Sequence, residues 1–121
     1  GNWTLQNAGG LRIENLGNVN VTLNLSGTKT AAQMIGGTSP AYEWTFSALE
    51  TNSCLNSTGT GESAALGSQE AVATSSTSVC GRFQFKDAAD TLRIDFDLTV
   101  PSDSFTGALG DTITATAFAA S

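Results

Sequence analysis

Apolar and polar residues alternate along most of this chain with a period of two. In a β-strand every second residue points to the same face, so the alternation predicts strands with one apolar face toward a core. The longest such run covers residues 92–100, and Pro101 ends it because proline cannot continue a backbone hydrogen-bond ladder. Its apolar positions are Leu92, Ile94, Phe96, Leu98 and Val100.

The same alternation predicts several further strands. Residues 11–16 and 19–26 alternate on either side of Gly17 and Asn18, which predicts two strands joined by a tight turn. No window shows the 3.6-residue apolar period of an amphipathic helix, so we expect an all-β fold. The expected architecture is an antiparallel β-sandwich, immunoglobulin-like or jelly-roll-like, with a long disulfide-pinned loop. Its remaining strands are expected over 42–46, 81–85 and 112–118.

Aromatic residues gather in one of these expected strands. Tyr42, Trp44 and Phe46 occupy alternating positions, which is typical of a strand face that packs into a core. An alternative interpretation joins Tyr42 and Trp44 with Trp3 in an aromatic platform for sugar binding. We favour the core interpretation.

Residues 51–80 differ from the rest of the chain because Ser, Thr, Gly and Ala fill most positions. Such a segment buries too little apolar surface to order itself alone. Cys54 and Cys80 bracket it, and a disulfide between them closes a loop of 26 residues, worth about 3.5 kcal/mol in the chain-entropy model. The alternative is two buried thiols. We expect a surface loop pinned at its base, with a short strand near residues 70–74.

The N-terminal segment is set apart from the sandwich. A short alternating stretch carries Trp3 and Leu5, and Gly9 and Gly10 follow as a flexible joint. Such a strand can fold back into its own sheet, or it can pair into the sheet of a neighbouring subunit as a donated strand. The expected parts are a candidate donor strand with its hinge at 1–10, and a single sandwich domain at 11–121 that includes the 51–80 loop.

Charge and composition narrow the function. The chain has 11 acidic and 5 basic side chains and a net charge of −6, which argues against nucleic acid as a partner. It contains no His, which removes His-based acid–base catalysis and most transition-metal sites. No run approaches the roughly 20 apolar residues of a transmembrane helix. We therefore expect no enzyme, no cofactor, no metal site and no membrane span.

The longest expected strand carries two carboxylates on one face. Asp95 and Asp97 share a face with Arg93 and Thr99, and the two carboxylates lie about 7 Å apart along the strand. A calcium site takes six or more oxygens from a shaped loop, and a glycosidase acid requires apolar burial. A strand face opposite the core provides neither, so we interpret the pair as part of a solvated face.

Glycosylation sequons indicate the compartment. Asn20 and Asn24 fall on the non-core face of a strand through 19–26, where glycans do not disturb packing. The chain begins at Gly1 without a signal peptide. We therefore expect either a mature form cut from a longer precursor or an excised piece. We expect an extracellular or cell-surface location reached through a removed signal peptide. The sequons begin at Asn2, Asn20, Asn24 and Asn56.

Part of the sequence resembles a known group of proteins. Residues 11–23, together with the later segment 100–103, Gly107 and residues 112–117, resemble archaeal cell-surface β-sandwich proteins. The ENLGN stretch within 11–23 is similar to subunits of archaeal extracellular filaments and surface layers. It is more distantly similar to camelysin-like biofilm-matrix fibre proteins of bacteria. Subunits of such fibre families polymerise by donating a strand to the next subunit, so the resemblance implies a homopolymer. It carries over no catalytic residue.

These observations together predict a structural subunit of an extracellular filament or surface layer. We expect it to polymerise by β-strand donation between identical subunits and to carry covalent N-glycans. Residues 1–8 are the expected donor, with Trp3 and Leu5 filling a groove in the next subunit. The rival donor is the C-terminal strand 112–118, in which Phe118 departs from the apolar alternation. The alternative function is a secreted module that binds carbohydrate or a receptor.

Overall fold

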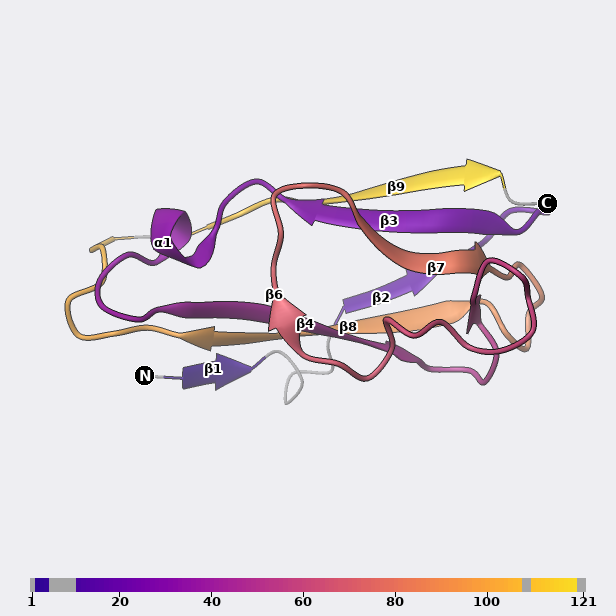
Figure 1. The fold of residues 1–121 in the computed structure, drawn as a ribbon, viewed down its shortest axis with the longest axis horizontal. Helices are drawn as coiled ribbons and strands as arrows, with labels where there is room; N and C mark the ends of the chain where they lie inside the picture. Colours follow the sequence, from indigo (N-terminus) through magenta and orange to yellow (C-terminus); the bar gives the residue numbers. More distant parts are fainter. Residues whose placement is uncertain (1, 5–10, 108–109, 120–121) are drawn as a thin grey trace.

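The computed structural model describes residues 2–4, 11–107 and 110–119, and it consists of two antiparallel β-sheets packed against each other (Figure 1). In the first sheet the strand order is β8, β4, β6, and both β1 and β2 pair with the free side of β8. Its strands are β1 (Asn2–Thr4), β2 (Leu11–Glu14), β4 (Ala41–Ala48), β6 (Glu70–Ala71) and β8 (Thr91–Thr99). The second sheet has the order β5, β7, β3, β9. Its strands are β3 (Val21–Gly27), β5 (Cys54–Leu55), β7 (Thr77–Phe83) and β9 (Ile113–Ala119).

This arrangement confirms the all-β sandwich expected from the alternating pattern. The only helix in the described ranges is α1 (Ala31–Met34), a single turn that the sequence did not predict because one turn is too short to show a period. The Thr30 hydroxyl accepts from the Gln33 backbone, and the Gln33 side chain accepts from the Thr30 backbone. This capping box satisfies backbone groups that a short helix leaves without partners. No helix in the described part of the chain is long and apolar enough to cross a membrane.

The expected hairpin around Gly17 and Asn18 is wrong. Strand β2 pairs with β8 in the first sheet, whereas β3 pairs with β7 and β9 in the second. The connection therefore crosses from one sheet to the other, because each strand buries its apolar face in the shared core from the opposite side. Asn15 shapes this crossing: its side chain accepts from the Gly17 backbone at 3.0 Å and donates to the backbone oxygens of Val19 and Phe83.

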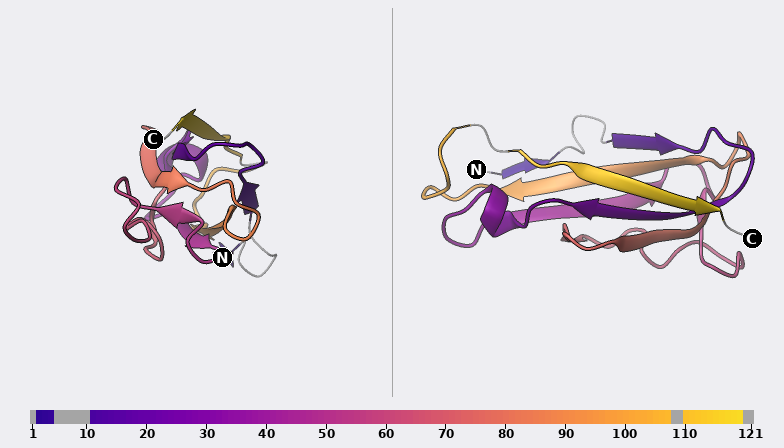
Figure 2. Two further views of the ribbon diagram at one scale, coloured as in Figure 1. Left: turned by 90° about the vertical axis from the view of Figure 1, so that its right-hand side faces the viewer. Right: turned by 90° about the horizontal axis from the view of Figure 1, so that it is seen from above.

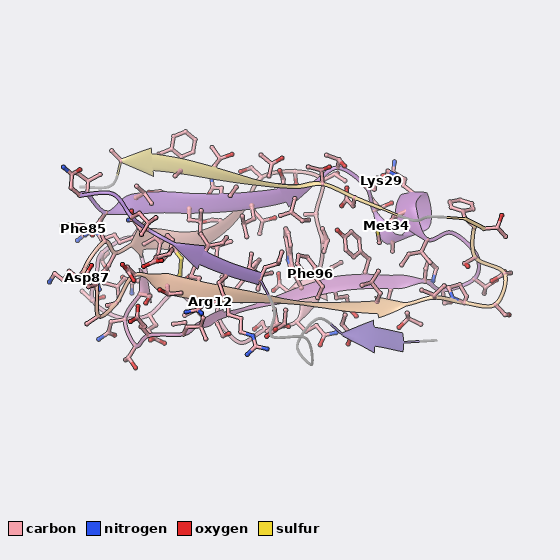
Figure 3. All side chains as sticks on the ribbon, turned by 180° about the vertical axis from the view of Figure 1, so that it is seen from behind. Arg12, Lys29, Met34, Phe85, Asp87 and Phe96 are labelled. Carbon is pink, nitrogen blue, oxygen red and sulfur yellow. A yellow bond between two sulfur atoms is a disulfide. The ribbon has the colours of Figure 1, made fainter. Side chains whose placement is uncertain are left out.

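The core lies between the sheets and is built from the alternating residues of β3, β4, β7 and β8. Trp44 is 1% exposed and packs against Phe46, with ring centroids 5.1 Å apart. Tyr42 stacks on Phe96, whose ring lies between the two sheets in Figure 3. The core interpretation of Tyr42, Trp44 and Phe46 is therefore confirmed, and these three rings are not part of a surface platform.

The 51–80 loop closes one long side of the sandwich. Cys54 and Cys80 form a disulfide, which confirms the expected bridge. Beyond it the backbone runs beside β4 and then reaches β3, through hydrogen bonds from Val72 to Tyr42 and from Gly27 to Ala73. Val72 is only 4% exposed, so the loop supplies core contacts in addition to its surface. The expected short strand near 70–74 is present as β6.

Candidate assembly surface

The opposite long side of the sandwich, between β2 and β9, has no such cover among the described residues. Within those ranges β9 pairs only with β3, and β2 pairs only with β8. Each of the two strands therefore presents a backbone edge without a strand partner. Figure 2 shows that β9 and β2 run along the same side of the molecule.

The inner face of β9 is open to solvent along this side. Ala115 pairs with Leu25 and Ala117 pairs with Leu23, and both leucines are almost fully buried. Residues directly opposite each other on neighbouring strands share a face, so the two alanines face the core side of the sheet. Both are nevertheless exposed. The leucines of β3 are covered, but among the described residues the inner face of β9 at Ala115 and Ala117 lacks the layer that would normally pack against it.

Strand β2 shows the same mismatch on the facing sheet. Leu11 pairs with Ile94 and Ile13 pairs with Leu92, so Leu11 and Ile13 also face the core side. Ile94 is 2% exposed, but Leu11 is 46% exposed. A leucine on the inner face of a sandwich is expected to be covered, and here the described residues cover it only in part.

The two open faces border a groove of about 210 Å³, which we call the β2–β9 seam. Among the described residues, Glu14 is the only charged one that lines it. The exposed side chains of Leu16 and Val19 lie in the connection that follows β2. An apolar exposed surface of this kind is typical of an interaction site. The seam is lined by Ile13, Glu14, Asn15, Leu16, Val21, Leu23, Phe83, Ala115 and Ala117.

The N-terminal strand lies at a different part of the same sheet edge. The backbone of β1 pairs with β8, with Trp3 opposite Leu98 and Thr4 opposite Asp97. Within one chain, the segment therefore folds back onto its own sheet, which is one of the two arrangements considered from the sequence. The other expected assembly residues, Leu5, Gly9 and Gly10, lie outside the described residues.

The rival C-terminal donor forms an integral strand of the second sheet. All seven residues of β9 pair with β3. Phe118 lies opposite Thr22 and is 55% exposed, so it faces outward. This agrees with the sequence, in which Phe118 departs from the alternation of apolar residues in this strand. Removing β9 from its sheet would break this whole ladder. Exchange between subunits is therefore more costly for β9 than for β1, which has only three residues.

The predicted glycosylation sites fall on different parts of the surface. Asn24 alternates with the buried Leu23 and Leu25, so it lies on the outer face of the second sheet. The side-chain oxygens of Asn20 and Asn24 are shielded from solvent and have no hydrogen-bond partner among the described residues. Asn2 lies in β1, and Asn56 begins the loop beyond Cys54, where its oxygen accepts from Thr58 and Thr60. Glycosylation of these four residues stays a prediction.

A polar cluster fixes the entry to β9. Asp111 accepts hydrogen bonds from the Thr28 backbone and hydroxyl, from the Thr112 backbone and from the Tyr42 hydroxyl, the last at 2.8 Å. Partial burial opposes ionisation of Asp111, but these donors outweigh it and hold its pKa below the usual value. The pKa of Tyr42 is raised, first by burial and then by its bond to Asp111. The cluster ties β9 to β3 and β4 at the end away from the seam.

The carboxylates of β8 lie on the outer face of the first sheet. Asp95 accepts from the Arg93 guanidinium at 2.8 Å, and Asp97 accepts from the Gln69 amide together with Glu43. Both contacts are those of a polar outer face. Among the described residues, no three His, Cys, Asp or Glu side chains gather closely enough to hold a metal ion.

The seam itself was not identified from the sequence. Its main signal was the alternation of Ala115 and Ala117 with threonines in the last strand, which places small residues where a core strand usually carries large ones. The partner strand of β2 was also misassigned, so the two walls of the seam were not placed side by side.

Comparison of the chain with protein-family models, curated proteins and solved structures finds no match.

Proposed function

We propose that this chain is a structural subunit of an extracellular filament or surface layer, and that identical subunits polymerise by β-strand donation. The observation that carries the proposal is the exposure of Ala115 and Ala117 on the inner face of β9. A sandwich that covers the inner strand faces on one long side and leaves the inner positions Ala115 and Ala117 exposed on the other is incomplete as an isolated molecule. A strand from another subunit supplies the missing layer.

Residues 1–8 are the proposed donor. Strand β1 is three residues long and pairs with β8 alone, and Gly9 and Gly10 follow it in the sequence. Donation exchanges this short pairing within one chain for pairing with a second chain, as in domain swapping. Because few pairs are broken, the exchange is less costly than the removal of any longer strand.

The apolar residues of the donor provide much of the driving force. A buried Trp covers about 150–250 Å², which at about 25 cal/mol per Å² corresponds to about 4–6 kcal/mol. A buried Leu adds about 2 kcal/mol. Association opposes this with about 4–15 kcal/mol of lost translational and rotational freedom. Contacts between the sandwich bodies must therefore contribute to a stable polymer.

The extracellular location is part of the same proposal. Oxidising conditions, such as those outside the cell, favour the formation of a disulfide like Cys54–Cys80. Peptide mapping of native material should find glycans at the outer-face residue Asn24, at Asn20, and then at Asn56. If all of these residues are unmodified in native material, the glycan part of the proposal fails.

Deletion of residues 1–8 tests the donor directly. We expect the shortened chain to be folded, soluble and monomeric by light scattering, and to form no filaments in negative-stain images. A synthetic peptide of residues 1–8 should bind it. Filaments of unchanged repeat after the deletion would show that another segment is the donor, with β9 the first alternative.

The same images separate the proposal from a binding module. Native material that forms filaments or lattices supports a structural subunit. Native material that stays monodisperse and monomeric, and that binds defined sugars on a glycan array, would instead support a secreted carbohydrate-binding protein.

A further inference from the structure

We infer that the β2–β9 seam is the acceptor for residues 1–8 of a second copy, and that the incoming strand pairs with the free edge of β9. The inference rests on the proposed function and specifies its acceptor. A simple exchange of β1 between two copies would place it on β8 again, at Asp97 to Thr99. Pairing with β9 is a different contact, and it extends the second sheet instead of the first.

The shape of the seam favours a strand that enters beside β9. The inner positions Ala115 and Ala117 carry the smallest apolar side chains, and both line the groove together with Leu23. Further along the strand Ile113 is partly buried and packs against the core. The open space is thus confined to the last part of β9, where an incoming strand can place large side chains opposite small ones.

The backbone and charge of the seam both match an uncharged strand. The outer edge of β9 offers a row of peptide groups, which only another extended backbone can satisfy in register. Of the residues that the structure describes, Glu14 alone brings a charge to the seam, in a chain with a net charge of −6. Two copies therefore repel each other over most of their surfaces. Residues 1–8 contain no charged side chain, and their Trp3 and Leu5 alternate with polar residues.

The position of the seam requires that the strand come from a second copy. Strand β1 pairs with the end of β8 at Thr99, whereas the seam residue Ile13 pairs with Leu92 at its other end. Figure 1 shows β1 toward one end of the long axis and the ends of β2 and β9 toward the opposite end. Because donor and acceptor surfaces differ and lie at opposite ends, each copy can accept one strand and donate another. Such head-to-tail contacts build an open filament when the rotation between successive copies does not close a ring.

Cysteine cross-linking between two different molecules tests this acceptor. Both native cysteines form the disulfide, so an introduced cysteine is the only reactive thiol. Thr4→Cys is mixed under polymerising conditions with thionitrobenzoate-activated Thr116→Cys. Thr4 lies between Trp3 and Leu5, and Thr116 lies between Ala115 and Ala117, so in the proposed pairing both substituted positions are on the outer faces of their strands. The expected result is a disulfide-linked heterodimer on a non-reducing gel. The matched mixture contains activated Asp97→Cys in place of the β9 variant, because Thr4 lies opposite Asp97 in β1–β8 pairing.

The two mixtures, read together with negative-stain images, distinguish the outcomes. Cross-linking of Thr4→Cys with Thr116→Cys in filaments, well above that with Asp97→Cys, supports the β9 acceptor. Filaments that cross-link only to Asp97→Cys would overturn the inference and leave strand donation intact, with β8 as acceptor. Absence of both filaments and cross-links in wild-type and variant mixtures would overturn the proposed function and the inference with it.

A substitution in the seam provides a second, independent measurement. Ala117→Arg places a charged side chain in the space for the incoming strand, and because Ala117 is exposed the melting temperature should stay unchanged. We expect filament yield to fall at least tenfold. Thr114→Arg is the matched control, since it lies on the outer face of the same strand opposite Ser26, and it should polymerise normally. Equal filament yields from the two variants would contradict the inference.

Discussion

Removal of the disulfide is expected to bring this fold close to its stability limit. In the double variant Cys54→Ala, Cys80→Ala, the chain loses a cross-link between residues 26 apart, which corresponds to about 3.5 kcal/mol of loop-closure entropy. Both cysteines are fully buried, and truncation of two buried sulfur atoms adds about 1 kcal/mol each. The expected total is about 5–6 kcal/mol, against a typical domain stability of about 5–15 kcal/mol.

Urea denaturation separates the two contributions. Fluorescence of the buried Trp44 reports on the core, and wild-type protein in reductant keeps both sulfur atoms while it loses the cross-link. We expect the reduced wild type to lose about 3.5 kcal/mol and the double variant to lose more. The difference between them measures the packing of the sulfur atoms alone.

One result would refute this reasoning. The loop between the cysteines has its own anchors, since Val72 is buried and its backbone donates to the Tyr42 oxygen. If these anchors already hold the loop in the unfolded ensemble, the cross-link has little entropy left to remove. Reduction would then lower the free energy of unfolding by less than about 1 kcal/mol, and the chain-entropy account would be wrong for this fold.

Three further predictions concern single positions. Tyr42→Phe removes the hydrogen bond to Asp111 and should lower the free energy of unfolding by about 1–2 kcal/mol in urea titrations; an unchanged midpoint would speak against that bond. Hydrogen bonds lower the pKa of Asp111 in the folded state. The ionised carboxylate therefore contributes its full stabilisation above the pKa of the unfolded state, and this stabilisation is lost as the pH falls below about 4 and through the folded pKa. Asp111→Asn should therefore flatten the stability profile between pH 2 and pH 5, roughly the carboxyl titration range, and an equally steep profile would count against this assignment. Gly81→Ala places a Cβ against the backbone of Ser57, closer than van der Waals contact allows. We expect about 2–3 kcal/mol of destabilisation by the same titration, whereas wild-type stability would mean that the loop yields easily.

The positions of the longest strands could be predicted from the sequence, but the partners of the strands could not. The strand expected over 81–85 is displaced, since β7 covers Thr77–Phe83 and ends there. Alternation over 92–100 and 42–46 marked β8 and β4 because both strands have one face in the core and one in solvent. Alternation carries no information about which strand lies alongside. The short separation of β2 and β3 suggested a hairpin, but Asn15 redirects the chain across the sandwich through contacts with Val19 and Phe83.

The open seam was missed for a related physical reason. Sequence analysis treats a small residue such as Ala115 as neutral, since alanine occurs both in cores and on surfaces. Only the register, which places it opposite the buried Leu25, shows that it lies on an inner face without cover. The role of the 51–80 loop was partly predictable, because Cys54 and Cys80 indicated its closure, but the burial of Val72 depends on the path that the bridge imposes.

The unequal sides of the sandwich determine which assembly the proposed strand donation produces. The side beside β6 is closed by a cross-linked loop and cannot admit another strand without loss of core contacts at Val72. The side beside β9 is open, and its inner positions are alanines. Exposure of an alanine leaves far less apolar area in water than exposure of a leucine, so a free subunit tolerates the open seam at a modest cost. Large apolar residues are exposed on the β2 side of the seam, at Leu11 and Leu16. The segment with Trp3 and Leu5 carries others, and in this proposal it meets the seam only on another copy. In this proposal the monomer stays soluble, while the polymer gains the burial that neither surface achieves alone.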